Sequence, residues 1–198
     1  MSTHTGTVNT AERPGINNRI ATRVRDLRSA RDLTLDALAT RCGVSRSMLS
    51  LIERSESSPT AVVLEKIARG LGVSLAALFD DPAAPASPVA RQRDHLPWRD
   101  PQSGYVRRNI SPDNYPAPFR IVDVTLPPKA RIAYEAGPRD VALAQQVWVR
   151  DGTLDITVGE TSWRLAEDDC LVMTLNAPIT FHNRTQQPVR YTVVIANG

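Results

Sequence analysis

Five side chains between residues 46 and 54 have the types and spacing with which a helix reads nucleic acid. Arginine can donate paired hydrogen bonds to guanine, serine can bond a base or a phosphate, and leucine can contact a thymine methyl group. Leu49 and Ile52 have the spacing of a buried helix face, which leaves the other side chains outward. The candidates for DNA contact are Arg46, Ser47, Ser50, Leu51 and Arg54. They predict a recognition helix for the major groove.

The residues just before this segment supply the elements that must position such a helix. Thr34 offers an N-cap side chain for one helix, and Gly43 can adopt the backbone angles of a tight turn at its end. Ser45 can then cap a second helix. Ala39 is small enough to let the two helices approach each other. Two helices joined by a tight turn that contains glycine form a helix-turn-helix.

Basic residues are concentrated in the same part of the chain. Residues 13–54 contain nine arginines and four acidic residues, a local net charge of +5, whereas the whole chain of 198 residues carries +3. A basic surface attracts polyanions and steers association with nucleic acid. A solvated helix face is the alternative interpretation when the charge is taken alone.

Apolar periodicity divides the chain into two halves. Residues 16–80 show the spacing of five helices: Ile20, Val24 and Leu27 form the stripe of the first, and the short fifth helix ends at Phe79. Proline, alanine and serine then predict a linker over residues 81–95. The polar residues 1–15 predict a disordered tail.

Residues 96–198 consist of short β-rich runs separated by turn residues. Asp151-Gly152 lies between two of these runs and is a strong hairpin signal. Many short strands with little helix predict a sandwich or a barrel. The expected strands are 120–126, 146–149, 154–158, 162–165, 170–173, 179–181 and 189–195.

The segment Leu35–Glu53 resembles the helix-turn-helix of the XRE family, which includes the phage lambda and 434 repressors. The run GVSRSMLSLIERSESSPT (Gly43–Thr60) resembles a bacterial branch of that family in which a cupin domain follows. The resemblance implies a five-helix, lambda-repressor-like domain. The loop 55–60 leads into a helix N-terminus, where free N–H groups could hold a DNA phosphate or could simply be capped.

Roles for the outward residues follow from the same resemblance. It implies that Arg46, Ser47 and Leu51 face bases and that Ser45 and Arg54 contact phosphates. Leu51 departs from the polar residue that is common there in the phage repressors, so only apolar contact is expected from it.

The second half resembles a cupin, an all-β jelly-roll (double-stranded β-helix) barrel, over about residues 105–195. The residues that carry this resemblance are the Gly152 turn, the turn at 165–169 and the strand at 178–183. Cupins of this kind hold a metal with two histidines and a glutamate from a first motif and one histidine from a second.

Those metal ligands are not matched in this sequence. Gln145 stands at the glutamate position, Ile179 at the position of the last histidine, and the first two histidine positions fall within residues 138–141. His182 lies one residue off the inward-facing parity, so we expect it to face solvent. Glutamine and isoleucine do not make the ligand shell of a divalent metal, and we expect no metal and no cofactor.

The expected barrel interior retains residues that could bind a small molecule. They combine apolar side chains with a few polar groups, as ligand sites often do. The alternative is that they simply fill the barrel. The candidates are Tyr134, Gln145, Val147, Ile179 and Phe181.

Taken together, the sequence predicts an α+β multidomain protein with an N-terminal helix-turn-helix domain and a C-terminal cupin barrel. We expect a transcriptional regulator that binds double-stranded DNA, at a pseudo-palindromic operator, as a homodimer. An effector in the barrel would modulate DNA binding through its different affinities for two states of the protein.

Two other classes of function stay open. A metal-free isomerase would need an acid/base pair, for which Tyr134, Glu135 and Asp140 are the nearby candidates. An antitoxin or protein-interaction module would present an exposed apolar patch on the barrel. We expect the regulator rather than an enzyme, because these three residues form no recognisable catalytic constellation.

The remaining composition favours a cytoplasmic protein without membrane contact. No apolar run approaches the roughly 20 residues of a membrane span, and the first fifteen residues lack the apolar stretch of a signal peptide. Cys42 and Cys170 have no partner motif, and we expect both to be buried free thiols.

Overall fold

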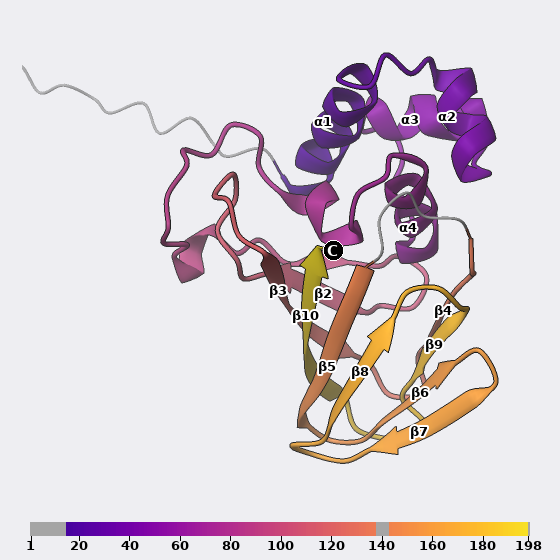
Figure 1. Ribbon diagram of the computed structural model, residues 1–198, viewed down its shortest axis with the longest axis vertical. Helices are drawn as coiled ribbons and strands as arrows, with labels where there is room; N and C mark the ends of the chain where they lie inside the picture. The colour runs from indigo at the N-terminus through magenta and orange to yellow at the C-terminus, as the bar shows by residue number, and fades with distance from the viewer. Residues whose placement is uncertain (1–14, 138–142, 198) are drawn as a thin grey trace, which may run out of the picture.

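The computed structural model describes residues 15–137 and 143–197, which form a helical half followed by two antiparallel sheets (Figure 1). The expected mixed α+β organisation is confirmed. The helices are α1 (Ile16–Ser29), α2 (Leu35–Cys42), α3 (Arg46–Glu53), α4 (Ala61–Gly70) and the 3-10 helices η1 (Leu75–Phe79) and η2 (Gln92–Asp94). The expected fifth helix is therefore a 3-10 turn, η1. In Figure 1, α4 lies between the other α-helices and the strands.

Side-chain caps determine where the central helices begin. Thr34 Oγ1 accepts a hydrogen bond from Ala37 N at 3.1 Å, and Ser45 Oγ accepts one from Met48 N at 3.2 Å. These bonds satisfy N–H groups that have no partner inside a helix. Between the two helices Gly43 has a φ of +67°, in the left-handed region that favours glycine. The predicted helix-turn-helix is present.

The strands form two sheets. The six-stranded sheet has the order β1-β2-β3-β10-β5-β8, and the four-stranded sheet has the order β4-β9-β6-β7. The chain passes from one sheet to the other several times, which is the arrangement of a jelly roll. The bounds are β1 (Trp98–Arg99), β2 (Val106–Asn109), β3 (Phe119–Leu126), β4 (Arg131–Tyr134), β5 (Leu143–Asp151), β6 (Leu154–Val158), β7 (Thr161–Leu165), β8 (Cys170–Thr174), β9 (Ile179–His182) and β10 (Val189–Asn197).

Each of the seven expected strands lies within an observed strand, whereas β1, β2 and β4 were not expected. One expectation about the cysteines is wrong. Cys42 is buried, but Cys170 is exposed, because it lies on the outer face of β8 at the edge of its sheet. His182 lies on the opposite face of β9 from the buried Phe181 and is partly exposed.

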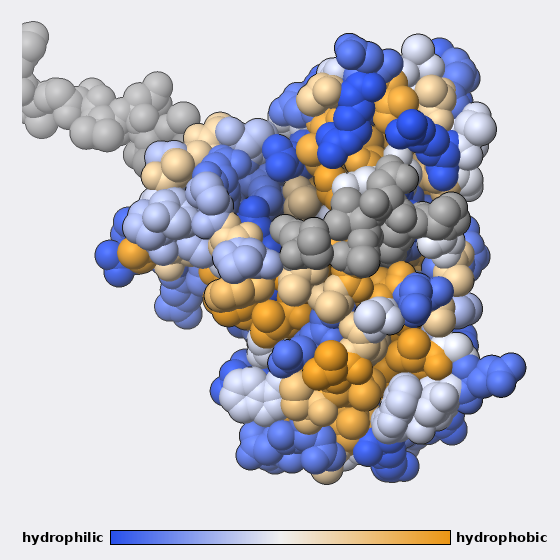
Figure 2. All heavy atoms as spheres, viewed as in Figure 1, coloured by the Kyte–Doolittle hydropathy of each residue, from blue (hydrophilic) through white to orange (hydrophobic). Residues whose placement is uncertain are grey.

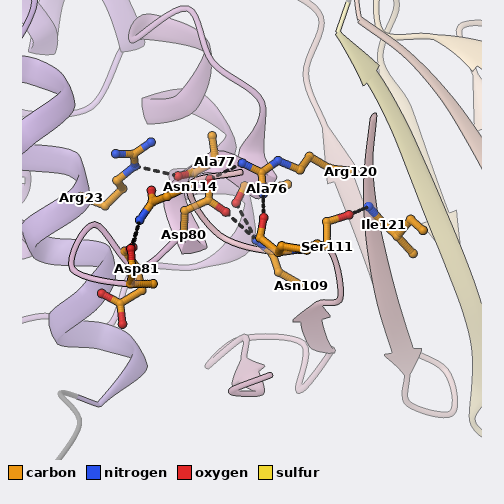
Figure 3. Close-up of polar contacts among 12 residues, drawn as sticks. Arg23, Ala76, Ala77, Asp80, Asp81, Asn109, Ser111, Asn114, Arg120 and Ile121 are labelled. Atoms are coloured by element: carbon orange, nitrogen blue, oxygen red, sulfur yellow. Dashed lines mark hydrogen bonds and ion pairs between the residues drawn. The ribbon is translucent and has the colours of Figure 1, made fainter. Parts of the chain in front are cut away.

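Polar contacts join the helical domain to the barrel. Asp100 Oδ1, just after β1, accepts a hydrogen bond from Ala61 N at 2.7 Å, at the first residue of α4. Asn109 on β2 donates to the carbonyl of Ala76 in η1 at 2.8 Å. Arg120 on β3 forms an ion pair with the buried Asp80 at 2.9 Å (Figure 3). Hydrogen bonds and an ion pair therefore hold the two domains together.

The connection between the domains is also attached to the barrel. Asn114 donates to the carbonyl oxygens of Asp81 and Ala84 at 2.7 and 2.8 Å. Within the described ranges, no helix has the length and apolar character that crossing a membrane would require.

The carboxyl group of Asp80 makes this interface sensitive to pH. Burial, opposed by Arg120 and reinforced by Asp113, raises the pKa of Asp80 to about 6. The pKa of an aspartate in an unfolded chain is about 3.9. The folded protein therefore holds this proton more tightly, and the stability that Asp80 contributes falls as the pH rises from about 4 to about 6.

We predict that the difference in melting temperature, wild type minus Asp80→Asn, falls by several degrees between pH 4 and pH 7. Thermal unfolding across this range measures the difference. Asp36→Asn, at an exposed carboxylate, is the control and shows no such trend. A difference that rises with pH would show that the ion pair with Arg120 outweighs burial.

Candidate nucleic-acid interface and barrel cavity

The N-terminal turn of α3 brings together three of the predicted DNA contacts. Ser45, Arg46 and Ser47 are all exposed. The hydroxyl groups of Ser45 and Ser47 lie 3.2 Å apart, and Arg46 Nε lies 3.3 Å from Asp36 Oδ1. The Arg46 and Asp36 side chains are 62% and 75% exposed, so this ion pair is weak and Arg46 is free to exchange it for another acceptor.

The C-terminal turn of α3 carries the other three. Arg54 donates to Ser50 Oγ at 2.5 Å and, through two nitrogens, to the carboxylate of Glu56 at 2.9 Å each. Leu51 is partly exposed beside them. The bond to Glu56 raises the pKa of Arg54 and lowers that of Glu56. All six predicted residues thus lie on the accessible side of one helix or at its ends.

The opposite side of α3 is packed into the domain core. Leu49 is fully buried and Ile52 is 1% exposed. Glu53, also buried, accepts two hydrogen bonds from Arg28 of α1, at 2.6 and 2.8 Å. Arg28 donates as well to the carbonyl of Leu33, and the bond to Glu53 raises the pKa of Arg28. This bidentate pair holds α3 against α1 and sets the orientation of the exposed face.

The N-terminus of α4 is occupied by protein groups. Ala61 N donates to Asp100, and Val63 N donates to Thr60 Oγ1 at 3.3 Å. Ala61 is also only 1% exposed. The capping alternative therefore describes these N–H groups, and the structure does not leave them free for a DNA phosphate.

We predict that Glu53→Ala lowers the free energy of unfolding by about 3 kcal/mol, because it leaves the guanidinium of Arg28 without its carboxylate in a largely buried site. Urea unfolding followed by circular dichroism measures this loss. The matched control is Glu56→Ala, which breaks an arginine pair at an exposed position and changes stability little. Equal effects of the two substitutions would contradict the positioning role of Glu53.

A cavity opens inside the barrel at the end nearest the helical domain. Its volume is about 760 Å³, including the open space at its mouth. Four of the five residues predicted as ligand contacts line it: Tyr134, Gln145, Ile179 and Phe181. Val147 is fully buried but does not border the cavity. Phe181 stacks on Tyr191 with ring centroids 5.7 Å apart, and Tyr134 meets its edge at 6.2 Å.

Sequence reasoning missed several residues that border this cavity. Arg107 enters from β2, and Tyr105 precedes it. Glu65, Ser74 and Leu75 come from the helical domain. Burial raises the pKa of Tyr105, and it raises those of Tyr134 and Tyr191 well above 10, so all three keep their hydroxyl protons at neutral pH. Of these residues, only Arg107 could have been noticed in the sequence, as an arginine in a strand that was not expected.

Among the residues that the structure describes, the cavity lacks the donor set of a cupin metal centre. Gln145 donates to the sulfur of Met173 at 3.4 Å, and Ile179 presents an aliphatic side chain. Over residues 15–137 and 143–197, no group of three or more histidine, cysteine, aspartate or glutamate side chains is placed to hold a metal ion. The two expected first-motif positions, within 138–141, lie outside the described residues.

Comparisons with known proteins agree with this architecture. Residues 24–78 match the helix-turn-helix family HTH_3. The HTH-type transcriptional regulator SutR of Escherichia coli K12 is 32% identical over 139 residues, which cover 70% of this chain and 72% of SutR. A solved HTH_3 family transcriptional regulator from Vibrio cholerae is 27% identical and has a TM-score of 0.72, with 91% of this chain and 96% of that one covered.

A cupin domain from an XRE family regulator of Enterobacter cloacae also matches, with 20% identity and a TM-score of 0.42 over 48% of this chain and 97% of that domain. The helix-turn-helix domain and the regulators that match it define a transcription regulator with a DNA-binding domain, here followed by a domain of two antiparallel sheets. The chain belongs to the XRE-type family of helix-turn-helix transcriptional regulators.

Proposed function

We propose that this regulator binds a pseudo-palindromic operator as a homodimer, with α3 of each copy in the major groove. The observation that carries the proposal is the division of α3 into a buried face and an accessible face with the six predicted contacts. A helix of eight residues reads few base pairs, so specificity needs two copies. Half-sites about one helical turn apart, roughly 34 Å, would then match the spacing of two recognition helices.

The dimer contact is proposed on the outer face of the six-stranded sheet. Trp148 on β5 and Val172 on β8 are 40% and 65% exposed, and Cys170 lies directly opposite Trp148 across the two strands. Apolar residues also lie over β5 and β8 on the face that Figure 2 shows. Burial of such side chains against a second copy would supply the hydrophobic contribution that association requires.

We predict that Trp148→Glu converts the dimer to a monomer, because it places a charge in the apolar contact. Light scattering after size-exclusion chromatography measures the mass. Trp163→Glu, at a similarly exposed tryptophan of the other sheet, is the matched control and leaves the mass unchanged. A wild-type monomer would contradict the dimer and would favour the second candidate function, in which this patch binds another protein as in an antitoxin module.

Small-molecule modulation is the second part of the proposal. A ligand in the metal-free barrel would change DNA affinity only if it binds two arrangements of the protein with different affinities. Glu65, Ser74 and Leu75 of the helical domain border the cavity, so a ligand there contacts both domains. We propose that the chain acts in the cytoplasm.

Catalysis by the barrel is a weaker hypothesis. Burial raises the pKa of Tyr134 well above its usual value, so the phenolate that would act as a base is scarcely populated at neutral pH. Glu135 forms an ion pair with Lys66 at 2.9 Å, and this pair lowers its pKa. Asp140, the third candidate, lies outside the described residues. The two described groups lack the pKa values near neutrality that acid/base catalysis favours, and we propose that the protein is not an enzyme.

Selection of genomic DNA fragments by the purified full-length protein, at near-physiological salt, tests the proposed function. Recovery of one motif with two-fold symmetry is the expected result. Recovery of unrelated fragments, or of an asymmetric motif, would contradict a dimer that reads a pseudo-palindrome.

We predict that Arg46→Ala weakens binding to the recovered operator by about 1–3 kcal/mol and relaxes specificity at one base position, because a paired contact to guanine is lost. Arg54→Ala weakens binding to all sequences alike and flattens the dependence on salt, because a phosphate contact is lost. Fluorescence anisotropy with operator and scrambled DNA measures both effects. Arg164→Ala, at an exposed arginine of β7, is the control, and unchanged affinity for Arg46→Ala would refute the base contact.

A further inference from the structure

We infer that the barrel cavity binds a small carboxylate with an apolar body and that Arg107 receives the carboxylate group. This inference deepens the proposed function, because it takes the barrel cavity as the effector site. It names a chemical class of ligand and an anchoring residue outside the set that the sequence predicted.

Arg107 lies on the inner face of the barrel, where a charged side chain is unusual. In the register of β2 it lies opposite Val124 of β3, and both are about 3% exposed. The next residue, Arg108, points to the other face, where it forms an ion pair with Asp123 and is 36% exposed. Adjacent arginines of one strand thus have opposite environments, and only Arg107 borders the cavity.

The guanidinium of Arg107 is incompletely satisfied by the surrounding protein. Its carbon lies 4.4 Å from the centre of the Phe79 ring, and one terminal nitrogen donates to Asn109 Oδ1 over a long 3.4 Å. The guanidinium also bonds the hydroxyl group of Tyr105. Its Nε is buried and has no hydrogen-bond partner among the described residues. A buried charge with an unused donor is costly, and an acceptor that enters the cavity would remove that cost.

The rest of the lining favours a carboxylate over other anions. Tyr105, Tyr134 and Tyr191 keep their protons and can donate to an anion once Tyr105 exchanges its present bonds with Arg107 and Tyr134. Most other lining residues are aliphatic or aromatic. One guanidinium balances a monoanion and matches the geometry of a carboxylate. Two glutamates also border the cavity, Glu65 with an ion pair to Arg69 and Glu135 with an ion pair to Lys66. Repulsion from these carboxylates is about twice as large for a dianion such as phosphate as for a monoanion.

The position of Arg107 explains how such a ligand would affect DNA binding. The Phe79 ring beneath its guanidinium ends η1 of the helical domain, and Trp98 meets the edge of that ring at 5.4 Å. A carboxylate that pairs with Arg107 changes the charge beside Phe79 while its apolar body contacts Leu75. Both effects act on the interface between the two domains.

Isothermal titration calorimetry of the full-length protein without DNA tests the inference. The probes are 4-methylpentanoate, its uncharged analogue 4-methylpentanamide, and inorganic phosphate. We expect the carboxylate to bind at least about tenfold more tightly than the amide or phosphate, which is the ratio that one charged hydrogen bond supplies. Arg107→Gln should lose at least about tenfold in carboxylate affinity, whereas Arg108→Gln, the matched control, should retain it.

Equal binding of carboxylate and amide, tighter binding of phosphate, or no binding of the carboxylate at millimolar concentration would overturn the inference. Equal carboxylate affinity of Arg107→Gln and wild type would overturn the role of Arg107. The comparison of acid with amide uses unaltered protein, so it decides the question even if Arg107→Gln does not fold, which thermal unfolding checks. Because no DNA is present, failure here leaves operator binding standing, and failed operator selection leaves carboxylate binding standing.

Discussion

The helical domain contacts the barrel through α4 and η1, and the rest of the structure depends on this contact. The backbone N–H of Ala61, the first residue of α4, donates to Asp100, and the ring of Phe79, the last residue of η1, packs on Trp98. The buried Asp80 pairs with Arg120. These groups are buried, so separating the domains would expose apolar rings and leave charged groups without partners. The helical domain is therefore held against the cavity end of the barrel.

The orientation of the DNA-reading face follows from this constraint through a short series of contacts. α2 packs against α4 at Gly70, where an added Cβ would lie 2.7 Å from the Cβ of Cys42. The Gly43 turn joins α2 to α3, and the Arg28–Glu53 pair holds α3 to α1. A shift of α4 relative to the barrel would move the whole recognition unit, because these contacts are buried and directional. A continuous series of contacts thus links the cavity end of the barrel to α3.

Local signals in the sequence are sufficient for the helical half. N-cap residues, a turn glycine and apolar spacing act over a few residues, so the places of Thr34, Gly43 and Ser45 follow from the sequence alone. In the second half, alternation predicts the strands with strongly apolar inner faces. β2 was missed because its inner residue is Arg107, which breaks the apolar pattern, and β1 is only two residues long.

The composition of the cavity could not be predicted in the same way. Gln145, Ile179 and Phe181 follow from strand parity, and Tyr134 follows from its place near the first metal motif of cupins. Glu65, Ser74 and Leu75 reach the cavity only through the packing of one domain on the other. Asp100 and Ala61 are likewise distant in sequence, so no local pattern indicates their bond. Contacts of this kind arise from tertiary structure, and the short-range spacing of residues in a single sequence does not indicate them.

Hydroxyl-radical footprinting of the full-length protein on its selected operator tests the central claim, that two copies of α3 read successive turns of the major groove. The account predicts two protected regions on one face of the duplex, with centres about 10 base pairs apart. A single protected region, or protection that does not depend on sequence, would contradict it.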